Sequence, residues 1–135
     1  MKKMRAISAI AAIAFTAITG FAGSATAGSY NGVCESSNGG EVCLYDTNNY
    51  TGAVYDTLYS KPQYTGTYYG TNTPIDDTVT STWNRDPDTR VWFFADPNYT
   101  GTDGGQEPGY KLNWEGGWSN KWSSHCFASN PSCPW

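Results

Sequence analysis

Apolar residues in this chain come in short runs separated by clusters of Gly, Pro, Asn and Asp. No run keeps a spacing of 3.6 residues over three turns, so the pattern argues against helices. Short apolar runs bounded by turn residues are typical of β-strands. We therefore predict an all-β fold with about eight short strands, at residues 42–46, 53–59, 64–69, 78–84, 90–95, a weak one after Thr102, 110–114 and 121–127.

One part of this pattern occurs twice, 49 positions apart. Residues 42–52 have the sequence VCLYDTNNYTG and residues 91–101 have VWFFADPNYTG, with five of eleven positions identical. Each copy has an aromatic residue, four turn-forming residues, a second aromatic, one residue and a glycine. This order suits a tight hairpin in which the glycine adopts a conformation that a Cβ would penalise and the aromatics cover the turn from inside. The repeat predicts two copies of one folding unit, at about 42–84 and about 90–127.

The N-terminus has the features of a secretory signal peptide. Three basic residues precede an apolar stretch at 6–21, and small residues end at Ala25-Thr26-Ala27. The stretch is shorter than the roughly 20 residues that a membrane span needs. We predict cleavage after residue 27, which leaves residues 28–135 as a single soluble domain outside the cell.

Charge narrows the class of partner. Without residues 1–27 the chain keeps five basic and twelve acidic residues, a net charge of −7. Such a chain repels phosphate backbones, so we expect no nucleic-acid partner. The carboxylates serve either solubility or the binding of a divalent cation.

Four cysteines lie in the predicted secreted part, and an even number in an oxidising compartment indicates two disulfides. Three pairings are possible. We favour Cys34 with Cys43 and Cys126 with Cys133, because each pair closes a short loop at one end of the repeated region. A zinc site is disfavoured because the chain has no Cys-x-x-Cys pair and His125 is its only histidine.

Catalytic chemistry finds little support in the residues. His125 lies next to Cys126, but that cysteine is expected to be oxidised, and no second histidine can act as a base. Asp76 and Asp77 are adjacent, and adjacent residues of a strand point their side chains to opposite faces. We therefore predict that the protein is not an enzyme.

A second pattern follows each hairpin. Residues 76–81 are Asp-Asp-Thr-Val-Thr-Ser, and residues 119–124 are Ser-Asn-Lys-Trp-Ser-Ser. Together with the hairpins, these hexapeptides resemble the two-part Greek-key signature of the βγ-crystallin superfamily, over about residues 42–127. The resemblance implies a sandwich of two Greek-key motifs. The second hexapeptide departs from the pattern at Ser119, where Asn or Asp is expected.

The same resemblance implies calcium sites where the two hexapeptides meet. Calcium takes six to eight oxygen ligands from carboxylates, amides, hydroxyls and backbone carbonyls. Carried over by position, the metal-binding residues are Asp76, Asp77, Thr78 through its carbonyl, and Thr80, together with Ser119 as the weak member, Asn120, Lys121 through its carbonyl, and Ser123. Ser81 and Ser124 would hold the hairpins by hydrogen bonds. The alternative is that both hexapeptides are turns in which Asp and Asn cap backbone donors.

The signal peptide, Cys34, residues 40–45 and the paired Greek keys together resemble the secreted actinobacterial metalloproteinase-inhibitor family. This implies a monomeric peptidase inhibitor directed at an extracellular metalloprotease. No segment matches an inhibitory loop, and residues 61–74 and 103–109 are candidates by length and glycine content alone.

Other functions fit the same fold. Four tryptophans lie near the C-terminus, namely Trp114, Trp118, Trp122 and Trp135. If they were exposed together, they would form a stacking platform for a cell-wall sugar or a partner protein. However, Trp122 and one or two others are expected in the core. The protein would then be a calcium-stabilised binding or structural module without inhibitory activity. A small toxin-like protein is a further alternative that leaves no trace at the level of residues.

Overall fold

The computed structural model describes residues 28–135, and the predicted signal peptide lies outside them. In this range seven strands form, with one short 3-10 turn before the first strand and two between strands. The strands are β1 (Val42–Tyr45), β2 (Val54–Thr57), β3 (Ser81–Asn84), β4 (Val91–Asp96), β5 (Thr100–Gln106), β6 (Lys111–Asn113) and β7 (Ser124–Phe127). The 3-10 turns are η1 (Ser37–Gly39), η2 (Asn48–Tyr50) and η3 (Gly116–Trp118). In the described part of the chain, no helix is long and apolar enough to cross a membrane.

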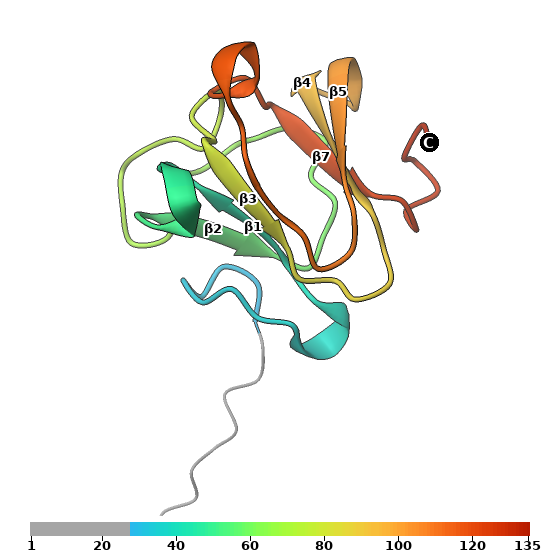
Figure 1. The fold of residues 1–135 in the computed structure, drawn as a ribbon, viewed down its shortest axis with the longest axis horizontal. Coiled ribbons are helices and arrows are strands. Elements are labelled where there is room, and N and C mark those ends of the chain that lie inside the picture. Colours follow the sequence, from blue (N-terminus) through green and yellow to red (C-terminus); the bar gives the residue numbers. More distant parts are fainter. Residues whose placement is uncertain (1–27) are drawn as a thin grey trace, which may run out of the picture.

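The strands form two antiparallel sheets, in the orders β2-β1-β3-β6 and β5-β4-β7 (Figure 1). Each unit contributes a segment to the sheet of the other. β6 of the second unit pairs with β3 of the first, with Leu112 opposite Thr82. In return, Lys61 of the first unit forms an isolated bridge with His125 in β7. The two units are therefore joined by backbone pairing as well as by their side chains.

The prediction of an all-β sandwich is confirmed, but the strand predicted at residues 64–69 is wrong. Tyr64 and Tyr68 are buried in the core, and the only pairing in this segment is a bridge from Thr67 to Pro74. Gly66 has a φ of 97° in the middle of the segment, which is incompatible with a regular strand. The alternation of aromatic and polar residues here reflects two core side chains on an irregular loop.

The core lies between the sheets and is filled from both units. Val42 and Leu44 enter it from β1, and Val91 and Phe93 enter it from β4. This alternation follows from the side-chain period of two in a strand. The remaining buried members come mainly from the loops, namely Tyr64, Tyr68, Ile75, Val79, Trp114, Trp122 and Phe127.

Both hairpins have the predicted form. Gly52 and Gly101 have φ values of 79° and 81°, the left-handed conformation that favours glycine. The paired aromatics are in contact in each copy, with ring centroids 6.4 Å apart for Tyr45 and Tyr50. The corresponding distance in the second copy, for Phe94 and Tyr99, is 5.8 Å.

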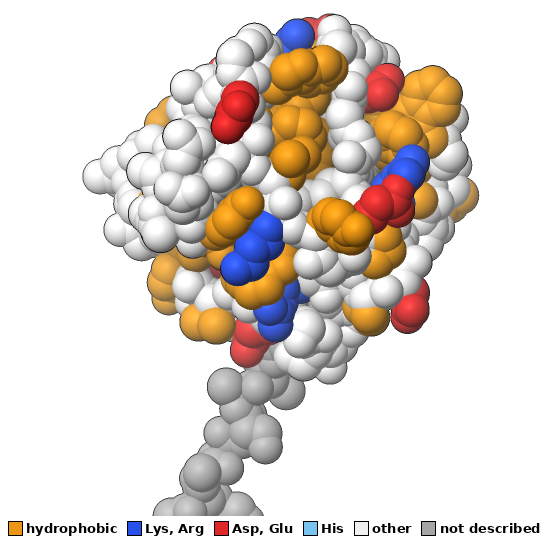
Figure 2. Space-filling model, in the orientation of Figure 1, with side chains coloured by type: hydrophobic (Ala, Val, Ile, Leu, Met, Phe, Trp, Pro, Cys, Tyr) orange, Lys and Arg blue, Asp and Glu red, His pale blue; other side chains and the backbone are white. Residues whose placement is uncertain are grey.

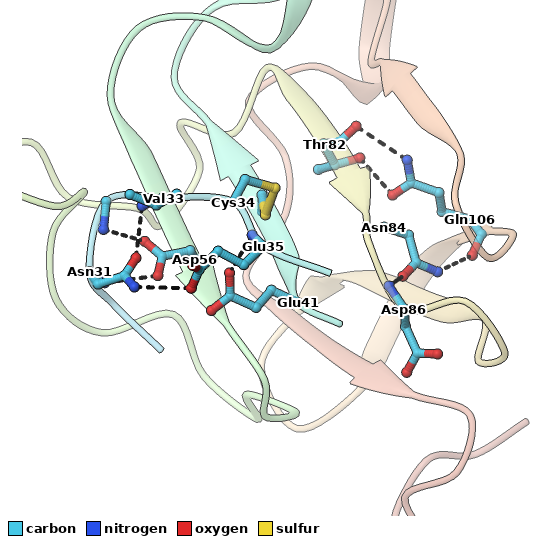
Figure 3. Close-up of a disulfide and its surroundings, with 12 residues drawn as sticks. Asn31, Val33, Cys34, Glu35, Glu41, Asp56, Thr82, Asn84, Asp86 and Gln106 are labelled. Carbon is cyan, nitrogen blue, oxygen red and sulfur yellow. Dashed lines mark hydrogen bonds between the residues drawn. A yellow bond between two sulfur atoms is a disulfide. The ribbon is translucent and has the colours of Figure 1, made fainter. Parts of the chain in front are cut away.

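The two favoured disulfides, Cys34–Cys43 and Cys126–Cys133, are confirmed. The first fastens the segment before β1 to the outer face of the first sheet, and Figure 3 shows the carboxylates that hold the same segment. Asp56 in β2 accepts hydrogen bonds from the backbone N–H groups of Asn31 and Gly32, at 2.8 and 2.9 Å.

Candidate metal centre

The two hexapeptides predicted to bind calcium lie against each other. The backbone N–H of Asp77 donates to the carbonyl of Trp122 at 3.2 Å. In the other direction, the N–H of Asn120 donates to the carbonyl of Val79 at 3.0 Å. The structure therefore brings together the segments that the sequence separates by more than forty residues.

Their side chains also face each other in reciprocal pairs. The Ser123 hydroxyl lies 3.4 Å from Oδ1 of Asp77. The Thr80 hydroxyl donates to Oδ1 of Asn120 at 3.1 Å. Each pair combines the second residue of one hexapeptide with the fifth residue of the other, so each candidate site draws on both units.

Oxygen atoms are crowded around the Thr80 hydroxyl. Besides Asn120 Oδ1, it lies 3.0 Å from the carbonyl oxygen of Asp46 and 3.4 Å from that of Thr78. A hydroxyl has one hydrogen to donate, so three acceptors around it leave lone pairs in excess. Carbonyl, amide and hydroxyl oxygens in one place are the donor set that calcium accepts. The residues present therefore fit this cation.

The electrostatics of Asp77 agree with a cation site. Partial burial raises the pKa of its carboxyl, and the negative charges of Asp76 and Asp96 raise it further. The hydrogen bond from Ser123 acts in the opposite direction. A divalent cation placed among these carboxylates would relieve their repulsion.

For two other residues of the predicted set, the contacts involve atoms other than the expected ligand oxygens. Ser119 bonds through its backbone N–H to the carbonyl of Gly116, and the Lys121 ammonium lies 5.2 Å from the centre of the Trp118 ring. Within residues 28–135, no group of three or more His, Cys, Asp or Glu side chains is placed to hold a metal. A cation here would therefore rely on mixed oxygen donors.

One premise about the acidic pair is corrected. Asp76 and Asp77 lie in a turn that precedes β3, which begins at Ser81, so the rule for adjacent strand residues does not apply to them. Asp77 has a φ of 54°, and Asn120 at the equivalent position has 55°. These left-handed residues turn the chain toward the other unit, which an alternating strand could not do.

The closing serines of both hexapeptides hold the hairpins, as predicted. The Ser81 hydroxyl donates to the carbonyl of Thr47 at 2.6 Å and accepts from the N–H of Tyr50 at 3.1 Å. Ser124 makes the same two bonds in the second unit, to the carbonyl of Asp96 at 2.7 Å and from the N–H of Tyr99 at 3.2 Å. The two parts of the repeated signature are thus in direct contact.

The sequence matches the peptidase inhibitor family I36 over residues 30–104, which is more than half of the chain. The chain belongs to peptidase inhibitor family I36. This membership implies a protease as its partner and agrees with the prediction that the protein is not an enzyme.

Solved structures confirm the fold of this family I36 member as that of a βγ-crystallin domain. One structure, reported under "Evolution of the eye lens beta-gamma-crystallin domain fold", is 21% identical in sequence and has a TM-score of 0.60. The match covers 73% of this chain and 95% of the other chain. A βγ-crystallin from an archaeon is 24% identical with a TM-score of 0.51, covering 64% of this chain and 95% of its own. A comparison with curated proteins found no significant match.

An inhibitor of family I36 needs an exposed segment to contact a protease, and the two candidate segments differ in structure. Residues 103–106 belong to β5, paired with β4 as far as Gln106, so residues 103–109 are not a free loop. Residues 61–74 form a loop that is anchored from inside by buried Tyr64 and Tyr68. Exposed residues lie on either side of these anchors, including Gln63, Thr65 and Tyr69.

The four C-terminal tryptophans do not form one exposed surface. Trp114 and Trp122 are buried, with ring centroids 4.6 Å apart. Trp118 is 41% exposed and stacks on Trp122, whereas Trp135 is 63% exposed and packs against Trp92 on β4. The expected core tryptophans are confirmed, and the exposed ones lie against different partners.

Proposed function

We propose that this protein is a secreted, monomeric inhibitor of an extracellular metalloprotease and that calcium stabilises its paired loops. The observation that carries the proposal is the match to peptidase inhibitor family I36 over residues 30–104. The predicted signal peptide at residues 1–27 and the two disulfides support an extracellular location.

The scaffold suits inhibition because its surface loops are fixed before binding. Two disulfides close loops near each end, and Tyr64 and Tyr68 anchor the 61–74 loop to the core. A loop that is already ordered loses little conformational entropy when it enters a protease cleft. We propose the exposed part of 61–74 as the segment that contacts the protease.

Calcium is proposed from the oxygen donors between the units. Asp77 with Ser123 would provide one half of the centre, and Asn120 with Thr80 the other. Asp76 and the carbonyls of Thr78 and Lys121 are further donors in the proposal, and Ser119 is the weak member. A cation held between the units would stabilise their contact without taking part in any reaction.

The test uses protein recovered from the culture medium of a host that expresses the full chain. It is assayed against a thermolysin-like metalloprotease and a panel of serine proteases. In one arm the inhibitor is loaded with calcium, and in the other it is preincubated with a chelator that is not added to the protease. We expect inhibition of the metalloprotease at micromolar concentration or below, and a higher Tm with calcium. Inhibition of no protease at micromolar concentration would reject the inhibitory function.

A binding module without inhibitory activity is the second candidate. Trp118 is exposed, stacks on buried Trp122 and carries the Lys121 ammonium over its ring. An exposed ring fixed in this way can stack on a sugar. Quenching of tryptophan fluorescence by cell-wall polysaccharides, without inhibition of any protease, would favour this function.

A further inference from the structure

The equivalent edge strands of the two sheets differ in whether other segments of the chain hydrogen-bond to them. β2 is the edge strand of the first sheet, and β5 is the edge strand of the second. The shared register makes Val54 equivalent to Asp103, because each lies opposite the first aromatic of its hairpin. Asp56 is likewise equivalent to Gly105.

The edge of β2 is covered by the chain itself. The N–H of Tyr69 donates to the carbonyl of Val54 at 2.8 Å, and the N–H of Tyr30 donates to the carbonyl of Asp56 at 2.8 Å. Two segments therefore satisfy the outward carbonyls of this strand and bring aromatic side chains to it. Tyr30 packs on Tyr55 with ring centroids 5.3 Å apart.

The edge of β5 has no such cover. The carbonyls of Asp103 and Gly105, the equivalents of the two that are filled in β2, have no backbone donor beyond the β4 ladder in the described part of the chain. At Asp103 the reason is a shorter connection in the second unit, and at Gly105 no segment takes the place that Tyr30 has on Asp56. Residues 65–74, which cover β2, have no counterpart in the short segment 113–118.

A pocket lies beside this open edge, where the sandwich ends between β5 and β6. Its volume is about 300 Å³, and it is lined by Gly104, Leu112, Asn113, Trp114, Glu115 and Trp118. Gly104 occupies the position of Tyr55 in the first unit, so the side chain that helps to close the first unit is missing here. A Cβ at Gly104 would lie 3.1 Å from the Trp114 ring, so the glycine allows the tryptophan to pack against the strand.

Two carboxylates, those of Asp103 and Glu115, and one ammonium, that of Lys121 over the Trp118 ring, lie near this edge, so the local charge is negative. All five basic side chains of residues 28–135 lie over aromatic rings, and Figure 2 shows Lys and Arg side chains lying against apolar ones. The sole salt bridge in this range joins Arg90 and Glu107. The carboxylates of Asp103, on the edge strand, and Glu115, in the pocket, are therefore not paired with cations.

We propose that the free edge of β5 is a strand-addition site for an extended segment of a partner protein that carries a large apolar side chain between basic residues. Its backbone N–H groups bond the carbonyls of Asp103 and Gly105. Its apolar side chain enters the pocket at Trp114 and Trp118, and its basic neighbours face Asp103. Main-chain bonds supply affinity in such additions, and pockets for alternate side chains supply specificity. The site goes beyond the proposed function and does not depend on inhibition of a peptidase.

A second copy of this chain fits the site poorly. β5 itself consists of Thr, Gly, Asp and Gln residues and has no large side chain to fill the pocket. Pairing two β5 strands would also bring the Asp103 carboxylates of both copies toward each other, and like charges on paired strands are destabilising. A heterologous segment avoids both problems.

The test titrates the ¹⁵N-labelled protein with the acetylated, amidated peptide Thr-Lys-Phe-Lys-Thr and follows the backbone amides by NMR. We expect saturable shifts along β5 and at Trp118. Replacing Phe by Gly in the peptide should weaken binding about tenfold or more, because burial of a large apolar side chain is lost.

Variants separate the three elements of the site. Asp103→Pro removes the carboxylate and an N–H of the free edge and places a ring where the partner strand would pair, so it should abolish binding. Trp118→Ala should weaken binding by opening the pocket, and Asp103→Asn should weaken it by removing charge alone. Asp88→Asn, on the exposed 85–89 connection, is the matched charge control and should bind as the unaltered protein does. If Asp103→Pro fails to fold, Trp118→Ala and the peptide without Phe still test the proposal.

Several outcomes would overturn the proposal of a strand-addition site at β5. One is the absence of shifts in β5 at millimolar peptide, and another is equal affinity for the Phe and Gly peptides. A third is that an oligosaccharide shifts Trp118 while the peptide does not. The last is concentration-dependent self-association through β5 that occurs without peptide and prevents peptide binding.

Discussion

Asp77 and Asn120 occupy equivalent positions in the two units and have nearly the same left-handed backbone, with φ values of 54° and 55°. Each points its side chain at a hydroxyl of the other unit, Asp77 at Ser123 and Asn120 at Thr80. Neither half of the proposed calcium centre can therefore form from one unit alone. The difference between them is chemical, since one half has a carboxylate and the other an amide.

This difference predicts how calcium affinity changes with substitution. Asp77→Asn should weaken calcium binding by about tenfold or more, because a hard cation prefers a charged carboxylate to an amide. Asn120→Asp should strengthen binding for the same reason. Both effects can be measured by calorimetric titration and by the rise of Tm with calcium.

The control for this pair is Asp88→Asn, which removes the same charge from the exposed 85–89 connection. It should bind calcium as the unaltered protein does. If the unaltered protein gives no heat and no rise in Tm at millimolar calcium, the metal centre does not exist and the paired loops are only a structural contact.

The hairpin glycines should be intolerant of a side chain. Gly101 has a φ of 81°, and a Cβ built there would lie 2.3 Å from Oδ2 of Asp96. Gly101→Ala should lower the free energy of unfolding by at least about 1 to 2 kcal/mol, the cost of a left-handed residue with a Cβ. Gly117→Ala is the matched control, because nothing lies within 4 Å of its Cβ position. Urea denaturation would compare them, and equal losses would contradict the explanation.

Local signals in the sequence were sufficient for the hairpins and the disulfides. Each of these depends on residues within about ten positions, such as the aromatic pair and glycine of a hairpin or Cys34 and Cys43. The meeting of the two hexapeptides, which are more than forty residues apart, was expected only from the resemblance to the βγ-crystallin superfamily. The carbonyl of Asp46 was missed as an oxygen neighbour of Thr80. A signal was available, since Asp46 directly follows the first aromatic of the hairpin, but a backbone oxygen has no residue type to recognise.

Features that depend on distant pairing could not be predicted. The exchange of β6 and Lys61 between the sheets needs contacts across the whole chain. The open edge of β5 is visible only when its equivalence to β2 is known in three dimensions. The difference in spacing between the two units is present in the sequence, but its structural effect depends on where Tyr69 folds back.

His125 should remain neutral in the folded protein. It is completely buried, its Nε2 lies 3.0 Å from the carbonyl of Tyr59 and its Nδ1 lies 2.9 Å from the Tyr64 hydroxyl. A carbonyl only accepts, so Nε2 carries the hydrogen and Nδ1 accepts from Tyr64. The pKa of the imidazole is lowered to about 4, chiefly by burial; the Tyr59 bond opposes the change and the charge of nearby Lys61 contributes to it.

This arrangement predicts a dependence of stability on pH. The pKa in the fold lies below the ordinary value of 6.5, so the unfolded chain binds the proton first. The contribution of His125 is complete above pH 6.5 and is lost as pH falls toward 4. NMR should show no titration of this imidazole above pH 5, and titration near pH 6.5 would contradict its burial. Tyr64→Phe should cost about 1 to 3 kcal/mol by leaving Nδ1 without a donor.

Glu41 should make stability depend on pH in the direction opposite to that of His125. Its side chain is buried just before β1, where Oε2 accepts from the N–H of Glu35 at 2.8 Å and Oε1 has no partner. The pKa of this carboxyl is raised from 4.5 to about 7, chiefly by burial, while the Glu35 hydrogen bond acts in the opposite direction and the charges of Asp56 and Glu35 add to the rise. The folded state therefore binds a proton that the unfolded chain releases between pH 4.5 and 7.

The stability contributed by protonated Glu41 is thus complete below pH 4.5 and is lost as pH rises through 7. Glu41→Gln, which is neutral at every pH and keeps the acceptor for Glu35, should remove this slope. At pH 8 it should raise the free energy of unfolding by about 1 to 3 kcal/mol, the cost of a buried polar group without a partner. Denaturation in urea at pH 5 and pH 8 compares the two proteins, with Glu115→Gln as an exposed control. A variant that is equally destabilised at both pH values would show that the ionised carboxylate holds the segment before β1 in place.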